Sequence, residues 1–275
     1  MKKAFGYIPR DTPVHRLTGA SKLIFTLLVS VAAMITFDTR LLVVIIVISL
    51  VLFKISQIKF SDFKYVLAIM ILFLVVNNIA IFLFSPEEGV GIYGTRNEIL
   101  HIAGRYYLTQ EQLFYQFNVT VKYLAVVPIA LVFFLTTEPG EFASSLNTLK
   151  VSFKVAFAVS LSLRYIPDIQ QSYREISQAQ QARGVDISKK APIRARLAGI
   201  LAILFPLVFS SLDRIELISN AMELRGFGRL KRRSWYKYRP FTRWDCVLVG
   251  VSILSVILSA VMVTVNDGRF FNPFV

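Results

Sequence analysis

Two copies of a short pattern, Ala-x-x-x-Arg-Gly, are the residues of this 275-residue chain whose types and spacing suggest specific recognition. In a helix, alanine and arginine four residues apart lie on one face, and glycine is favoured just beyond the helix end. The pattern therefore predicts two rigid helix tips, each carrying a planar guanidinium that suits carboxylates or carbonyls in a receiving groove. The residues are Ala179, Arg183 and Gly184 in the first copy, and Ala221, Glu223, Arg225 and Gly226 in the second.

Either copy alone would be an ordinary helix C-cap. The two arginines are 42 residues apart, and each follows an amphipathic stretch with apolar residues at spacings of three and four. Chance alone expects far fewer than one such match in a chain of this length. The repetition therefore favours a shared role for Arg183 and Arg225.

Other motifs for chemistry are weak or absent in the sequence. No Gly-x-x-x-x-Gly-Lys-Ser/Thr phosphate loop occurs, so the chain is not a P-loop nucleotide-binding subunit. Residues 89–94 match Gly-x-Gly-x-x-Gly, but no strand-to-helix context surrounds them, and we expect a β-hairpin or loop there. His15 and His101 are isolated, and the single cysteine, Cys246, excludes disulfides and cysteine-based metal sites.

The composition places these residues in a membrane protein. Hydrophobic residues make up 55% of the chain and charged residues only 17%, whereas soluble domains have about 25% charged residues. This balance excludes an ordinary water-soluble enzyme, and the 23 Phe and 11 Tyr exclude a disordered chain. Lys and Arg number 31 against 17 Asp and Glu, a net charge of +14.

Five apolar stretches are expected to span the membrane as helices, so the sequence predicts an all-α, polytopic protein. Two of them are 20 residues long without an Asp, Glu, Lys or Arg. Two shorter ones form a tight helical hairpin whose ends extend through snorkelling Lys22 and Lys54. The fifth contains Lys122 and Pro128, which neighbouring helices can accommodate. The stretches are residues 65–84 and 246–265, the hairpin 23–37 and 41–53, and 112–137.

The distribution of Lys and Arg predicts the orientation, because cytoplasmic loops are enriched in them. The N-terminal stretch is basic, residues 85–111 are acidic, and residues 138–245 carry 18 basic and 9 acidic side chains. We therefore expect a cytoplasmic N-terminus and three parts of the chain. These are a membrane domain at 1–137 with an external loop at 85–111, a cytoplasmic region at 138–245, and a last transmembrane helix with an external tail at 246–275.

Two apolar runs within the cytoplasmic region are too short to be certain spans. Residues 155–163 and 197–212 are uncharged, and an amphipathic stretch follows each run. Pro167 comes after the first run, and Pro206 lies within the second. How deeply they enter the bilayer is left open by the sequence.

The chain resembles the transmembrane (T) component of energy-coupling factor transporters, a branch of the ATP-binding cassette importers, over nearly its whole length. The matching residues are Asp11–Leu17, Leu163–Pro167 leading to Gln178–Gly184, Phe205-Pro206, Asp213–Glu216 and Ala221–Phe227. The resemblance implies long cytoplasmic coupling helices and a bacterial or archaeal cell membrane. It implies ATPase docking by Arg183 and Arg225, with the other residues of the two copies shaping the tips.

The resemblance also implies the partners. Two ABC-type ATPase subunits bind ATP and Mg²⁺, a small membrane substrate-binding (S) component binds a vitamin or a transition metal ion, and this chain performs no bond chemistry. We expect no cofactor in this chain and no nucleic-acid partner. The basic run 229–233 lies just before the last span, where an anchor over anionic lipid is the better explanation.

Two other classes of membrane protein match the sequence less well. An integral-membrane enzyme acting on an anionic lipid or polyprenyl phosphate would need clustered Asp or His, whereas the nine acidic residues of 138–245 are scattered singly. A secondary transporter would need inverted repeats and ionisable residues near the middle of the membrane, and the five expected spans show neither.

Overall fold

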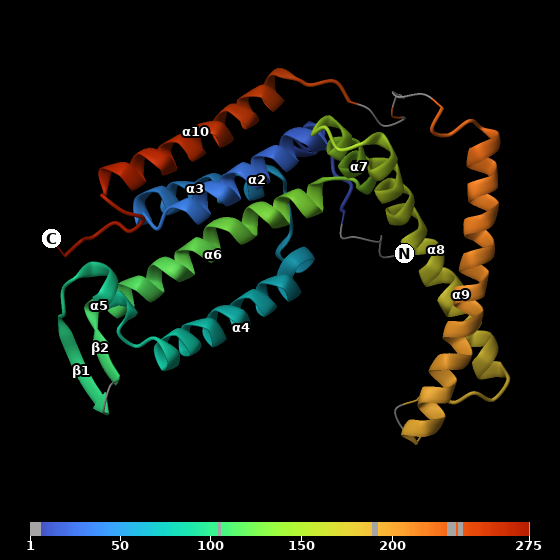
Figure 1. Ribbon diagram of the computed structural model, residues 1–275, viewed down its shortest axis with the longest axis horizontal. Helices are drawn as coiled ribbons and strands as arrows, with labels where there is room; N and C mark the ends of the chain where they lie inside the picture. Colours follow the sequence, from blue (N-terminus) through green and yellow to red (C-terminus); the bar gives the residue numbers. More distant parts are fainter. Residues whose placement is uncertain (1–6, 104–105, 189–191, 230–234, 236–238, 275) are drawn as a thin grey trace. The chain divides into compact units, whose positions relative to one another are not determined.

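The computed structural model describes residues 7–103, 106–188, 192–229, 235 and 239–274. The chain divides into two compact units (Figure 1). One comprises Gly6–Glu138 and Arg239–Val275, and the other consists mainly of Pro139–Tyr238. Each unit is described by itself below.

The first unit contains all five stretches expected to span the membrane, and each forms a helix. The short α1 (Pro13–Arg16) and α5 (Glu88–Tyr93) accompany them. The long helices are α2 (Gly19–Ile35), α3 (Thr39–Ile55), α4 (Phe60–Phe84), α6 (Gln110–Thr136) and α10 (Arg243–Val265). The predicted class, an all-α polytopic membrane protein, is confirmed.

Length and composition single out four helices in the described part of the chain as able to cross a membrane: α4, α6, α10 and, in the second unit, α9 (Ile193–Leu224). Helices α2 and α3 have 17 residues each, or about 25 Å at 1.5 Å per residue, which is at the lower limit for a span. The sequence left the depth of 197–212 open, and the structure places that run within the 32-residue helix α9.

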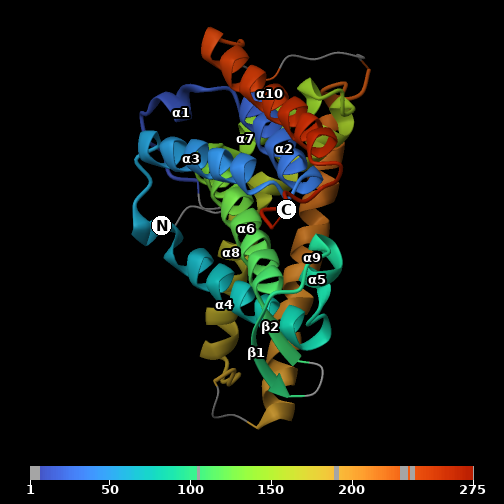
Figure 2. The same cartoon turned by 90° about the vertical axis from the view of Figure 1, so that its left-hand side faces the viewer.

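The core of the first unit lies where α2, α3 and α6 pack together, as seen most clearly in Figure 2. Helix α10 packs along α2 and buries Ser252, Ser255 and Ser259, spaced at three and four residues. Small side chains allow helices to approach closely, which is how association is achieved in a bilayer that offers no hydrophobic drive between helices. The buried core side chains are Phe25, Val29, Ala33, Leu41, Leu42, Ile45, Val121, Ala125 and Ile129.

Helix α4 contacts α6 through a narrow seam that includes polar side chains and the Phe73 and Tyr123 rings, 5.4 Å apart. Only Met70 and Leu74 of α4 are buried. The Asn78 side-chain amide donates to the Thr120 hydroxyl (3.1 Å), and Gln116 donates to the Asn78 carbonyl (3.2 Å). Asn78 is therefore an interhelical hydrogen-bonding residue, which the sequence could not decide.

The segment expected to be a β-hairpin or loop, residues 89–94, is instead part of the helix α5, and the β-hairpin follows it. Strands β1 (Glu98–Ala103) and β2 (Tyr106–Thr109) pair antiparallel. Gly89 is required where it stands, because a Cβ there would lie 2.5 Å from the backbone of Glu111. Gly89, the first glycine of the motif, thus serves close packing between α5 and α6.

One expectation about the helix ends was wrong. Lys22 was expected to snorkel outward, but its side chain is buried and its ammonium donates to the Thr136 carbonyl at 2.8 Å. The last carbonyls of a helix lack intrahelical partners, and a cation there also complements the helix dipole. Lys22 of α2 is therefore a C-cap for α6.

Asp245 joins the beginnings of α2 and α10. Its buried carboxylate accepts five hydrogen bonds: Oδ1 from the Thr18 N–H (2.8 Å), the Thr18 hydroxyl (3.0 Å) and the Ser21 hydroxyl, and Oδ2 from the Thr242 N–H (2.8 Å) and hydroxyl (2.6 Å). Thr18 and Thr242 are the N-cap residues of the two helices. One carboxylate therefore links the two chain segments of the unit, which the long insertion between α6 and α10 separates in the sequence.

We predict that Asp245→Asn lowers the free energy of unfolding by about 2 kcal/mol. In asparagine an NH2 group replaces one carboxylate oxygen, and this hydrogen-bond donor would face the N–H and hydroxyl donors that the oxygen accepts from. That loss corresponds to a midpoint of thermal unfolding lower by roughly 4–8 °C. Thermal unfolding of the purified protein in detergent measures it, with exposed Asp267→Asn as the matched control. An unchanged midpoint in Asp245→Asn would contradict this role.

The N-terminal segment packs against the same end of the unit. His15 is buried, with Nδ1 2.7 Å from the Thr12 hydroxyl and Nε2 3.1 Å from the Ile8 carbonyl. The Ile8 N–H donates to the Leu135 carbonyl (3.1 Å) near the end of α6. Burial is the largest cause that lowers the pKa of the His15 imidazole, because the charged form loses its hydration.

This shift predicts a pH dependence of stability. Below its ordinary pKa of about 6.5, His15 binds a proton in the unfolded chain before it does so in the folded chain, so the free energy of unfolding falls as pH falls. Between pH 7.5 and 5.5 the unfolding midpoint of the wild type should fall more steeply than that of His15→Gln. Exposed His101→Gln serves as the control and should follow the wild type. Parallel curves for all three proteins would refute the assignment.

The second unit is helical in its described part. It consists of α7 (Pro139–Thr148), α8 (Phe153–Ala182) and α9. Pro167 lies inside α8 and Pro206 inside α9, so each apolar run and the amphipathic stretch after it form one continuous helix. The two Ala-x-x-x-Arg-Gly copies stand at the C-terminal ends of these two helices.

Candidate coupling site at two helix ends

The end of α8 is closed by backbone hydrogen bonds around Arg183 and Gly184. Arg183 is the C-cap residue, and Gly184 follows with φ +87°. The Gly184 N–H donates to the Gln181 carbonyl (3.0 Å), and the Val185 N–H donates to the Gln180 carbonyl (3.1 Å). This pair of bonds is a Schellman motif, which requires the left-handed conformation that glycine adopts readily.

The end of α9 repeats the same geometry. Arg225 is the C-cap residue, and Gly226 has φ +64°. The Gly226 N–H donates to the Glu223 carbonyl (2.8 Å), and the Phe227 N–H donates to the Met222 carbonyl (2.9 Å). The repeat seen in the sequence is therefore a repeat of structure. Each arginine lies at the cap itself, just beyond the last turn.

Helices α8 and α9 run antiparallel, so the two arginines lie at opposite ends of the pair (Figure 1). Arg214 is 3.6 Å from Asp168, and Gln180 donates to the Ala202 carbonyl (3.2 Å). Phe227 lies beside Phe157, near the start of α8. Since Phe157 and Arg183 are about 26 residues apart on one helix, the tips are separated by about 40 Å.

Most residues of the two copies are exposed, and Gly226 is half-buried. Among the residues that the structure describes, no group of three or more His, Cys, Asp or Glu side chains could hold a metal ion. The chemistry available at the tips is hydrogen bonding and charge pairing by guanidinium groups. That chemistry is suited to binding another protein.

Packing that the sequence analysis missed supports each tip. At the first, the chain beyond Gly184 folds back on α9, where a Cβ at buried Gly199 would lie 2.9 Å from Ile187 and 3.0 Å from Val185. At the second, Phe227 packs against Phe157 with ring centres 4.7 Å apart.

An aromatic cluster extends the second support. Phe153 lies 5.3 Å from the Trp235 ring, whose Nε1 donates to Asn147 of α7 (3.2 Å). The aromatic residue directly after Arg-Gly was the available signal in the sequence. Gly199, by contrast, had no local pattern to mark it.

Several helices with the length and composition of spans, together with two exposed helix ends that each carry an arginine, define a helical membrane protein. Comparison with known proteins agrees. The family model described as cobalt transport protein (CbiQ) matches residues 10–236, and the chain belongs to this family.

Relatives of similar length carry the name energy-coupling factor transporter transmembrane protein EcfT. That of Exiguobacterium sibiricum is 29% identical over 95% of this chain and 98% of its own length. That of Streptococcus thermophilus is 28% identical, and that of Bacillus subtilis 25%, each over 92% of this chain and 95% of the relative.

The resemblance inferred from the sequence is thereby confirmed. The chain is the non-catalytic membrane scaffold subunit of an energy-coupling factor transporter and a multi-pass membrane protein. The alternative of a membrane enzyme acting on an anionic lipid or polyprenyl phosphate is not favoured.

We predict that alanine at Gly184 or Gly226 frays the corresponding tip, because a side chain in the left-handed conformation costs about 1–2 kcal/mol. Hydrogen exchange at the Val185 and Phe227 amides should accelerate about 5- to 30-fold. The larger effect is expected at Gly226, where a Cβ would also lie 3.1 Å from the Arg229 side chain. Gly250→Ala, in open space within α10, is the control. Unchanged exchange at both tips would exclude strain at the glycines.

Proposed function

We propose that Arg183 and Arg225 are the points at which two ABC-type ATPase subunits bind, with α8 and α9 acting as coupling helices. The observation that carries the proposal is the duplicated helix end. The same Schellman-capped arginine occurs twice, at opposite ends of one antiparallel helix pair. Two equivalent tips are suited to two similar receiving grooves.

The arginine chemistry supports a protein groove as the receiver. A guanidinium presents donors in a fixed plane, which suits carboxylates and backbone carbonyls in a groove. Ala179 and Ala221 lie four residues before each arginine, and their small side chains leave room for close approach. Glu223, exposed on the second tip, adds a charge that could distinguish the two docking sites.

The ATPase subunits would bind ATP and Mg²⁺, and their closure on ATP would move the two tips. Because each tip ends a helix of 30 residues or more, movement at the arginine is transmitted along α8 and α9. This chain would therefore transmit force to the membrane and perform no bond chemistry.

We propose that α9 carries this movement to a membrane-embedded S component. Its middle part is uncharged and exposes large apolar side chains, which lipid or another apolar membrane protein would have to cover. The cargo would be a vitamin or a transition metal ion, and the family description names cobalt. The exposed side chains are Leu197, Leu201, Leu204, Phe205, Val208, Phe209 and Leu212.

The charge distribution supports the proposed sidedness. The N-terminus and the polar parts of residues 138–245, including both tips, would be cytoplasmic, and residues 85–111 and the C-terminal tail would be external. The tips would then face the compartment that contains ATP. The proposed parts of the chain remain 1–137, 138–245 and 246–275.

We predict that Arg183→Glu or Arg225→Glu weakens ATPase binding at least tenfold, because reversing an interfacial charge costs several kcal/mol and 1.4 kcal/mol corresponds to tenfold. Co-purification of ATPase subunits from native membranes measures binding, and uptake of the cargo should be lost in the double variant.

The matched control is Arg174→Glu, the same charge reversal at an exposed position of α8 away from both tips. Its ATPase binding should remain at the wild-type level. Wild-type binding and uptake in the Arg183/Arg225 double variant would refute the coupling role, provided that the variant is present in the membrane at normal amounts.

A further inference from the structure

The β-hairpin after α5 has two chemically different faces. Leu100 pairs with Leu108, and the neighbouring pair His101 and Tyr107 points to the opposite face, because adjacent residues of a strand alternate. Tyr106, two residues before Leu108, lies on the leucine face. Ile99 and Leu100 are more than half exposed. The hairpin is therefore amphipathic, and Leu100 on its apolar side is 57% exposed.

The leucine face continues the surface of α4. Tyr106 hydroxyl donates to the Leu83 carbonyl at 3.4 Å, and its ring lies 6.0 Å from that of Phe82. Phe82 and Leu83 belong to the last turn of α4, which ends at the highly exposed Phe84. Because α4 is long and apolar enough to cross the membrane, its last turn marks the depth at which hydrocarbon gives way to headgroups.

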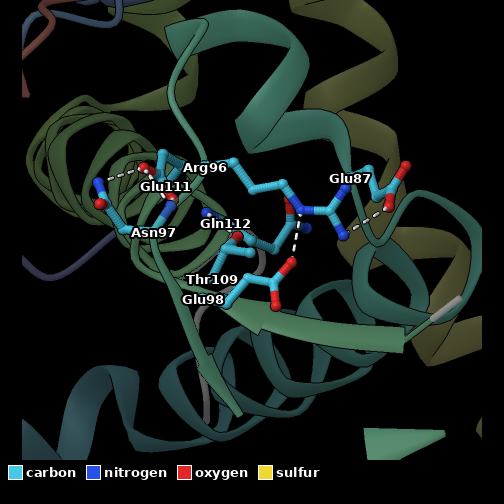
Figure 3. Close-up of polar contacts among 7 residues, drawn as sticks. All are labelled: Glu87, Arg96, Asn97, Glu98, Thr109, Glu111 and Gln112. Carbon is cyan, nitrogen blue, oxygen red and sulfur yellow. Dashed lines mark hydrogen bonds and ion pairs between the residues drawn. The ribbon is translucent and has the colours of Figure 1, made fainter. Parts of the chain in front are cut away.

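The other face of the hairpin is polar and carries a group of charged side chains. The Arg96 guanidinium lies 2.7 Å from Glu98 and 3.8 Å from Glu87 (Figure 3). It also stacks over the Tyr107 ring at 4.7 Å. His101 lies beside the same ring, with centres 4.4 Å apart. This face would keep its hydration if the leucine face turned toward lipid.

The base of the hairpin is fixed to α6 by the buried Glu111 carboxylate. It accepts from the Asn97 N–H (3.0 Å), the Asn97 side-chain amide (2.8 Å) and the Thr95 hydroxyl (2.9 Å), as Figure 3 shows in part. Gln112, the next residue, accepts from the Gly89 N–H (2.8 Å) and donates to the Ser85 carbonyl (3.1 Å). The orientation of the hairpin is thus set by α6.

We propose that this hairpin is a membrane-interface anchor, with Leu100 inserted at the boundary between lipid headgroups and acyl chains. The occupant is lipid because the apolar face is continuous with the exposed apolar surface of α4. The tyrosines match the aromatic belt typical of that depth. The anchor would add a lipid contact at the end of α4, which the seam at Asn78 and the hydrogen bond from Gln112 to Ser85 tie to α6. This inference is independent of the ATPase proposal and of which side faces the cytoplasm.

The test uses spin labels at two adjacent positions. Cys246→Ser provides a cysteine-free chain, into which Leu100→Cys and His101→Cys are introduced separately, since both side chains are exposed. The labelled proteins are reconstituted in vesicles of phosphatidylcholine and phosphatidylglycerol. Relaxation by oxygen, which concentrates in lipid, is compared with relaxation by a water-soluble nickel chelate.

We expect the Leu100 label to be favoured by oxygen, at a depth of about 5–10 Å, and the His101 label to be favoured by the nickel chelate. Equal access of the chelate to both labels would overturn the proposal. A Leu100 label shielded from both reagents would also overturn it, because protein and not lipid would then cover the face. Size-exclusion profiles identical to that of the Cys246→Ser parent show that both variants fold.

Discussion

The stability of the first unit depends on how the free backbone groups at its helix ends are satisfied. A helix leaves four N–H and four C=O groups without intrahelical partners, and inside a bilayer water does not supply them. Here the partners come from other segments. The Asp245 carboxylate serves the beginnings of α2 and α10, and Lys22 and the Ile8 N–H serve the end of α6. Arg269 donates to the last carbonyls of α2 at 2.6 and 3.0 Å.

These contacts also explain how one unit is built from two distant pieces of chain. The insertion of 139–238 separates α10 from the helices against which it packs. Asp245 stands at the point where the chain returns, and its hydrogen bonds to Thr18 and Ser21 determine the register of α10 against α2. The tail beyond α10 repeats the principle, since Asn266 donates to Asp38 at the start of α3 (2.9 Å).

The same constraint is met differently at the ends of α8 and α9. There the carbonyls are capped by backbone N–H groups in Schellman motifs, and glycine at positive φ makes this geometry inexpensive. Lys22 and Arg269 use their charges to cap a helix, whereas Arg183 and Arg225 are not needed for capping. The physical basis of the coupling proposal is that both arginines are exposed at helix ends whose carbonyls are closed by the backbone itself.

The sequence by itself determined the properties that depend on local pattern. Apolar stretches of sufficient length predicted every membrane helix of the first unit, and the two Ala-x-x-x-Arg-Gly copies predicted two capped helix ends, because helix periodicity and glycine conformations act within a few residues. Only the tertiary structure decided the antiparallel arrangement that separates the arginines, the burial of Lys22, and the carboxylate junctions at Asp245 and Glu111. Each of those joins residues distant in the chain, and a charged side chain gives no local sign of whether its partner is water or the end of another helix.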